Sequence, residues 1–285
     1  MIGKMDKRNF IWLICLILSG IIVILLSSCD VFKTPVGDEN PDDNPFDPNN
    51  PDYQPPLATI TQGPSDGSII GNDFVTFSWT GNNLECQFSY TLDEAEPSAW
   101  GSGKTVTFNY LDEGDHSFQV KARYSADDVQ ENPSSVAFTV NAITGPALWI
   151  YHKKTTTSIN SDFAVDVVVE EVTDLSMASV EVNFDPTYLQ IRAYEVLEDG
   201  SILSGKQLIK VDSHDDNVGK LTVYLALVGE SDSGISGTGS IIRVHFLSRK
   251  RGTTEVEFGD DCYFRKSDNS TIPIVNKAKS LVEIR

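Results

Sequence analysis

The chain has 285 residues, of which 40% are hydrophobic and 22% charged, so it holds enough apolar material for two modest folded domains. Lys and Arg number 22 against 41 Asp and Glu, which gives a formal net charge of −19. A charge of this sign opposes binding to phosphate backbones, and we therefore expect no nucleic-acid partner.

Residues 1–28 have the composition of a secretory leader. The basic stretch MIGKMDKR precedes the apolar run FIWLICLILSGIIVILL, and LSSC follows. This order is typical of a signal peptide. The LSSC segment resembles the bacterial lipobox, which implies cleavage before Cys29 and attachment of lipid to its sulfur. We expect a membrane-anchored lipoprotein on the cell surface or the periplasmic side; an uncleaved transmembrane helix is the alternative.

Residues 29–56 are rich in proline and in acidic side chains, and their apolar residues occur singly. Such a segment cannot bury enough apolar surface to form a core. We predict an acidic, Pro-rich, disordered tether that lifts the following domains away from the membrane.

Residues 57–143 alternate apolar and polar side chains in several short runs. These runs include FVTFSWT, ECQFSYT, HSFQVKARY and SVAFTV, and turn residues separate them. We predict an immunoglobulin-like or fibronectin-like β-sandwich, and the sequence resembles the bacterial immunoglobulin-like spacer modules. Alternation places Trp79 inward, so Trp100 is the one tryptophan of this module that we consider for sugar stacking.

Residues 146–285 contain about nine further strand signals with turns between them, which predict a second sandwich of jelly-roll type. The expected fold class is therefore all-β, with two β-sandwich domains after the leader and the tether. Three phrases of this module, VNFDPTYL, GKLTV and GISGTGSIIRVHF, occur in the order found in the cohesin family, which the module resembles. The resemblance implies docking of a dockerin-like protein, in assemblies that degrade polysaccharide.

Alternation also predicts which side chains form the docking surface. Apolar residues of strands 177–184 and 220–228 point inward, and the residues between them point outward. The residues that we predict to bind the partner are Met177, Ser179, Glu181, Asn183, Thr222, Tyr224, Ala226 and Val228. Cohesins carry an Asn and an Asp where this chain has Met177 and Ser179, so the recognition groups of the family are not preserved.

We expect no enzymatic activity, no cofactor and no metal site. The four histidines are scattered, and the sequence has no nucleophile elbow, zinc-binding helix or phosphate-binding glycine loop. Cys86 and Cys262 fall in different predicted domains and are expected to be buried thiols. Two alternatives to protein docking remain: direct binding of polysaccharide, and a passive surface stalk or adhesin.

Overall fold

The computed structural model describes residues 44–125, 128–198, 201–229 and 234–285, and the chain divides into two compact units, 1–55 and 56–285. The predicted leader, Cys29 and the first part of the tether lie outside the described residues. In the described part of the chain, no helix is both long and apolar enough to cross a membrane.

The described end of the tether is turned rather than extended. The backbone N–H groups of Asp47, Asn50 and Tyr53 each donate to the carbonyl oxygen three residues earlier, at 2.8–3.1 Å. Side chains of Asn44 and Asp47 accept bonds from the N–H groups two residues ahead, as Asx turns do. Asn and Asp side chains thus supply local hydrogen bonds within residues 44–53 of the predicted tether.

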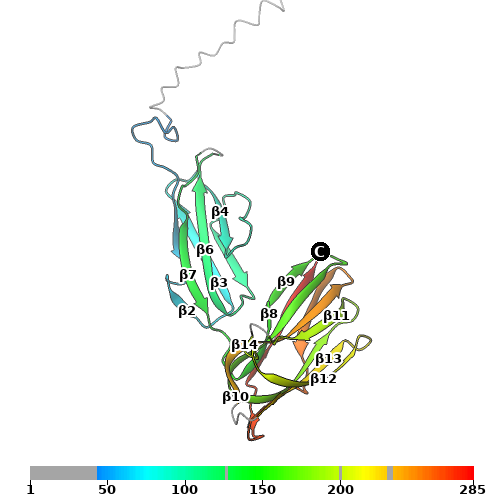
Figure 1. The fold of residues 1–285 in the computed structure, drawn as a ribbon. Coiled ribbons are helices and arrows are strands. Elements are labelled where there is room, and N and C mark those ends of the chain that lie inside the picture. Colours follow the sequence, from blue (N-terminus) through cyan, green and yellow to red (C-terminus); the bar gives the residue numbers. More distant parts are fainter. Residues whose placement is uncertain (1–43, 126–127, 199–200, 230–233) are drawn as a thin grey trace, which may run out of the picture. The chain divides into compact units, whose positions relative to one another are not determined.

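The first sandwich consists of two sheets (Figure 1). One sheet has the strand order β1-β3-β5 and the other β2-β7-β6-β4. The strand bounds are β1 Ala58–Gln62, β2 Ser68–Ile70, β3 Phe74–Gly81, β4 Gln87–Leu92, β5 Thr105–Asn109, β6 Gly114–Arg123 and β7 Ser134–Val140.

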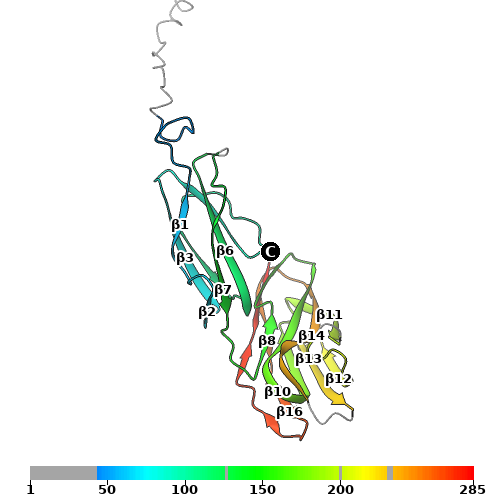
Figure 2. The same cartoon turned by 60° about the vertical axis from the view of Figure 1, so that its left-hand side comes forward.

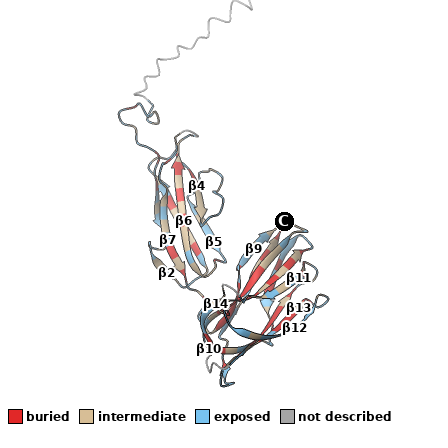
Figure 3. Ribbon diagram, viewed as in Figure 1, coloured by how far each residue is buried: buried red, intermediate tan, exposed pale blue. Residues whose placement is uncertain are grey.

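An aromatic core fills the space between these sheets. The rings of Phe77 and Phe118 stack with centroids 3.9 Å apart, and Trp79 and Phe88 pack beside them. Alternate residues of β3 and β6 are buried, as the two-residue period predicts, and Figure 3 shows this alternation of buried and less buried positions along β6. The structure is thus all-β here, as expected.

Over its described residues, the second sandwich has twelve strands linked in one hydrogen-bonded network. Their bounds are β8 Ala147–Tyr151, β9 Lys154–Thr157, β10 Asp162–Phe184, β11 Leu189–Val196, β12 Gln207–Asp215, β13 Lys220–Val228, β14 Ile235–Ser248, β15 Gly252–Phe258, β16 Tyr263–Lys266, β17 Thr271–Ile272, β18 Asn276–Ala278 and β19 Ser280–Ile284.

Strand β10 takes part in both layers of this sandwich. Its first half pairs with β8 and β14, and its second half pairs with β13, β15 and β16. Between the halves, Glu171 and Asp174 have positive φ angles of 49° and 57°, and the pairing with β14 shifts register there. The sequence predicts two separate strands over this range; the structure joins them by bulges, which bend a strand without ending it.

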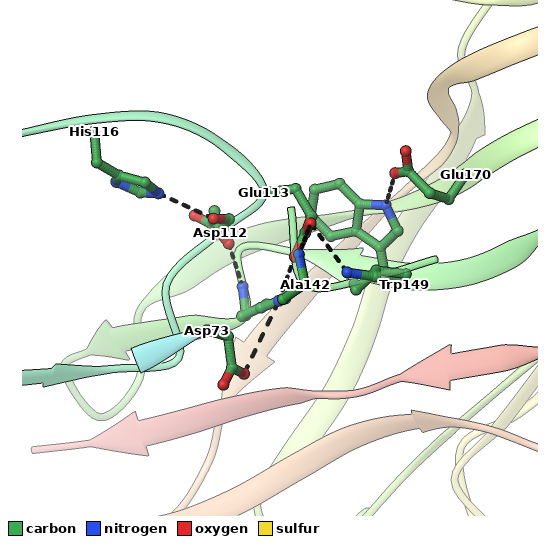
Figure 4. A network of polar contacts seen from close by, with 9 residues as sticks. Asp73, Asp112, Glu113, His116, Ala142, Trp149 and Glu170 are labelled. Atoms are coloured by element: carbon green, nitrogen blue, oxygen red, sulfur yellow. Dashed lines mark hydrogen bonds and ion pairs between the residues drawn. The ribbon is translucent and has the colours of Figure 1, made fainter. Parts of the chain in front are cut away.

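The two sandwiches meet at a polar junction (Figure 4). Glu113 accepts a bond from the Lys153 ammonium at 2.7 Å and further bonds from the N–H groups of Ala142 and Ile143. Lys153 is only 3% exposed, so this ion pair is shielded from water. Asp112 beside it accepts from the Lys153 N–H and bonds the His152 ring, both at 2.6 Å.

The hydrogen bond with Asp112 is the main reason why the pKa of His152 lies above its ordinary value. The sequence indicates only a turn at residues 112–115, because the partner of that turn lies about 40 residues further along the chain.

Candidate docking face

Four neighbouring strands place the predicted partner-binding residues on one surface. β10 and β13 are antiparallel neighbours, with Met177 opposite Ala226 and Ser179 opposite Tyr224. β12 pairs with the free side of β13, and β16 pairs with the other side of β10. Figure 2 shows these strands together in the second sandwich. We call this surface the candidate face.

The inward side of these strands is as predicted. Ala178, Val180, Val182 and Phe184 are buried, and so are Leu221, Val223 and Leu225. Phe264 of β16 and Ile241 of β14 join the same core cluster. The alternation of β10 and β13 therefore fixes which side of the sheet faces outward, and all eight predicted residues lie on that side.

Exposure is uneven over the candidate face. Met177 is 37% exposed, Tyr224 42% and Val228 44%, and Ala226 is half-buried between them. Ser179 has no exposed surface, and Glu181 and Thr222 are only 5% and 6% exposed. The expectation that alternation leaves these last three residues open to a partner is therefore wrong.

The segment at residues 259–262 explains the burial of Ser179 and Glu181. The Ser179 hydroxyl donates to the carbonyl oxygen of Asp261 at 2.9 Å, and the N–H of Gly259 donates to the carbonyl oxygen of Glu181. The Glu181 side chain lies so close to Gly259 that an added Cβ there would come within 1.8 Å of its Oε1. The chain before β16 thus covers one end of the candidate face.

Glu181 is held as a carboxylate in this enclosed position. Lys220 lies 2.7 Å from one of its oxygens, and the Asn183 amide donates to the other at 3.3 Å. Burial alone raises the pKa of Glu181, but the hydrogen bonds from Lys220 and Asn183 and the lysine charge together hold that pKa below its ordinary value. The hydrogen bond with Glu181 raises the pKa of Lys220 in turn.

Three exposed apolar side chains belong to the candidate face but are not among the residues predicted from the sequence. Ile209 and Val211 of β12 are each 56% exposed and lie opposite Ala226 and Tyr224, and Tyr263 of β16 lies opposite Ser179. The alternation in QLIKVDS and the short turn before Gly219 are the signals that could have placed β12 next to β13. With them the open part of the face has an apolar centre, and Gln207 opposite Val228 and Arg265 opposite Met177 lie beside it.

The other side chains considered for metal binding or thiol chemistry form no common site in the part of the chain that the structure describes. In the described ranges, no group of three or more His, Cys, Asp and Glu side chains is arranged to hold a metal ion. Cys86 and Cys262 are free thiols; Cys86 is buried as predicted, whereas Cys262 is only half-buried, and desolvation raises its pKa.

A comparison with protein families decides how this face is interpreted. Residues 151–281 match the family model of the cohesin domain. The match spans just under half of the chain and includes all eight residues that we predicted to bind the partner. We refer to this part of the chain as the cohesin-like domain. No curated protein matches the chain.

Several solved structures are similar to the chain at low identity. A type II cohesin domain from the cellulosome of Acetivibrio cellulolyticus is 20% identical with a TM-score of 0.41, and the match covers 47% of this chain and 94% of that one. A non-cellulosomal cohesin from Archaeoglobus fulgidus is 15% identical with a TM-score of 0.39, covering 49% and 90%. A type I cohesin–dockerin complex from Clostridium thermocellum is 14% identical with a TM-score of 0.40, covering 49% and 98%.

Proposed function

We propose that this chain is a membrane-anchored, extracytoplasmic binding protein whose cohesin-like domain docks a dockerin-like protein. The observation that carries the proposal is an open apolar surface on a domain that matches the cohesin model. Its exposed side chains are Met177, Ile209, Val211, Tyr224, Val228 and Tyr263. A role in holding polysaccharide-degrading enzymes belongs to the same proposal.

The chemistry of the candidate face favours a partner with an apolar surface of its own. Tyrosine and methionine are enriched in protein interfaces, where a buried apolar centre is surrounded by a polar rim. Ser179 is not available to such a partner, because its hydroxyl is buried and already bonded to Asp261. Recognition therefore depends on apolar contact around Tyr224 and Met177 rather than on the Asn and Asp of other cohesins.

A docking protein of this kind needs no catalytic group. We therefore propose that the chain is not an enzyme and that it acts by positioning a partner. Lipid on Cys29 is the proposed means of attachment to the membrane, and its support is the resemblance of LSSC to the lipobox.

Binding of purified dockerin modules tests the proposal. We expect the full-length protein to bind a type I or a type II dockerin in isothermal titration calorimetry. The double variant Tyr224→Ala, Met177→Ala should weaken binding by at least about tenfold, because interface energy concentrates in a few central side chains. Its thermal unfolding midpoint should stay close to that of the wild type, since both side chains are partly exposed.

A matched control is Val218→Ala, which removes an apolar side chain that is 66% exposed in the turn between β12 and β13. This variant should bind as the wild type does. Equal affinity of the folded double variant and the wild type for a dockerin would remove the candidate face from the proposal, and no affinity for either dockerin type would remove the dockerin-like partner.

A further inference from the structure

An open hollow lies on the outer side of the β4–β6 sheet in the first sandwich, away from the candidate face in the sequence and in the fold. It has a volume of about 470 Å³, which is within the usual size range of ligand sites. Its rings include those of Trp100, Pro97 and Pro133, and its polar side chains include those of Thr91, Gln119 and Lys121. We call it the β4–β6 hollow.

The aromatic wall of this hollow is held in place before any ligand arrives. The guanidinium of Arg123 lies 4.5 Å from the centre of the Trp100 ring, and two bonds of 3.0 and 2.9 Å to Gln87 fix that guanidinium. The segment that carries Trp100 is tied to β4, because Gly101 and Phe88 exchange backbone hydrogen bonds. A fixed ring loses little conformational freedom when a ligand stacks on it.

The polar side chains of the floor include one free amide. Thr91 and Gln119 lie opposite each other on β4 and β6, on the side away from the aromatic core. The Thr91 hydroxyl and the Lys121 ammonium are bonded to the carbonyl oxygens of Ala95 and Glu131. The Gln119 side chain has no hydrogen-bond partner among the described residues, so its amide can both donate to and accept from a ligand.

We propose that the β4–β6 hollow binds a neutral saccharide. A sugar ring offers an apolar face that stacks on a tryptophan and hydroxyl groups that bond an amide, and these are the two kinds of group that Trp100 and Gln119 present. Among the residues that the structure describes, no acidic side chain lines the hollow, so these residues offer no carboxylate to fix a cation. The Lys121 ammonium in the lining is bonded to the carbonyl oxygen of Glu131, and the net charge of −19 opposes the approach of a polyanionic glycan, so we infer a neutral one.

Affinity electrophoresis of the purified full-length protein tests this inference. Gels contain hydroxyethyl cellulose, xyloglucan or galactomannan as neutral glycans, and polygalacturonate as an acidic one. We expect at least one neutral glycan to retard the protein and polygalacturonate not to. Trp100→Ala should raise the dissociation constant at least about tenfold. Gln119→Ala should raise it about threefold to tenfold, the effect of one hydrogen bond.

Phe74→Ala is the matched control, because it removes an aromatic ring of the same sandwich that is 52% exposed and does not line the hollow. This variant should be retarded as the wild type is. Gln119→Ala keeps the test decisive if Trp100→Ala does not fold, as judged from its circular dichroism spectrum.

The inference would be overturned if none of the three neutral glycans retarded the protein, or if folded Trp100→Ala were retarded as strongly as the wild type. Binding only to a synthetic proline-rich decapeptide would also overturn it, because grooves with aromatic walls accept such peptides too. None of these results bears on dockerin binding, since the hollow and the candidate face lie in different sandwiches.

Discussion

Glu181 is a carboxylate enclosed at the covered end of the candidate face. Removing a carboxylate from water is costly, and the nearby Lys220 and Asn183 offset that cost. Because the pKa of Glu181 is lower in the folded chain than in the unfolded one, the unfolded chain takes up a proton first as the pH falls. The stabilisation is therefore complete above the unfolded-state pKa and is lost as the pH falls through the folded-state pKa.

We predict that Glu181→Gln lowers the free energy of unfolding by about 1–3 kcal/mol at neutral pH, because the amide keeps the size of the side chain and loses its charge. Urea unfolding at about pH 7 and about pH 3 measures the effect, and the gap between variant and wild type should narrow at the lower pH. Glu255→Gln is the control, since Glu255 also pairs with a lysine but is exposed. If the free energies of unfolding of Glu181→Gln and the wild type differed equally at both pH values, the charge of Glu181 would not be the cause of the stabilisation.

At the scale of elements, the loop between β5 and β6 links the first sandwich to the start of the second. The side chains of Asp112 and Glu113 in this loop bond five groups: the N–H groups of Ala142, Ile143 and Lys153, the Lys153 ammonium and the His152 ring. Buried charges that lose a partner destabilise a fold strongly, because the remaining charge stays out of water. The loop is therefore a structural link and not merely a turn.

We predict that Glu113→Ala lowers the free energy of unfolding by about 3 kcal/mol, since among the described residues it leaves the buried Lys153 ammonium with Asp73, at 3.9 Å, as its acidic partner. Guanidinium unfolding followed by tryptophan fluorescence measures this loss. Glu94→Ala, which removes an exposed acid of the same sandwich, should change the free energy of unfolding by less than about 0.5 kcal/mol. Losses of similar size in the two variants would argue against a buried ion pair.

Particular residues show which side chains of these elements could be placed from the sequence and which could not. The two-residue period placed Ala178, Val180 and Val182 inside correctly, because a strand buried on one face leaves that pattern directly in the sequence. It failed for Ser179 and Glu181, because burial there comes from residues 259–262, about 80 positions away. No local pattern predicts such long-range cover, and the same reason hid the contact between Asp112 and His152.

At the scale of the whole molecule, the proposed function combines an anchor at one end with two sandwiches that follow it. The strongly negative charge suits a protein that stays dissolved outside the cell and does not adhere to anionic lipids. The anchor is the part of this proposal that depends on a single side chain, the sulfur of Cys29. That residue lies outside the described part of the chain, so its test is chemical.

We predict that cells grown with an alkyne analogue of palmitate label the wild-type protein and not Cys29→Ser. The labelled protein should enter the detergent-rich phase of a Triton X-114 separation, because acyl chains partition strongly into apolar phases. Cys86→Ser is the matched control, since Cys86 is a buried thiol of the first sandwich and its loss should leave the label in place. An unlabelled wild-type protein would exclude the lipid anchor.

The bend in β10 limits where residues can be inserted into this strand or deleted from it. Met177 follows the residues of positive φ, Glu171 and Asp174, by only a few positions, and its outward direction depends on the count of residues between them. Deleting or inserting one residue between Asp174 and Met177 would exchange the two sides of the strand that follows, turning Met177 into the core and Ala178 to the solvent. Gaps between residues 175 and 184 should therefore be rare in related sequences.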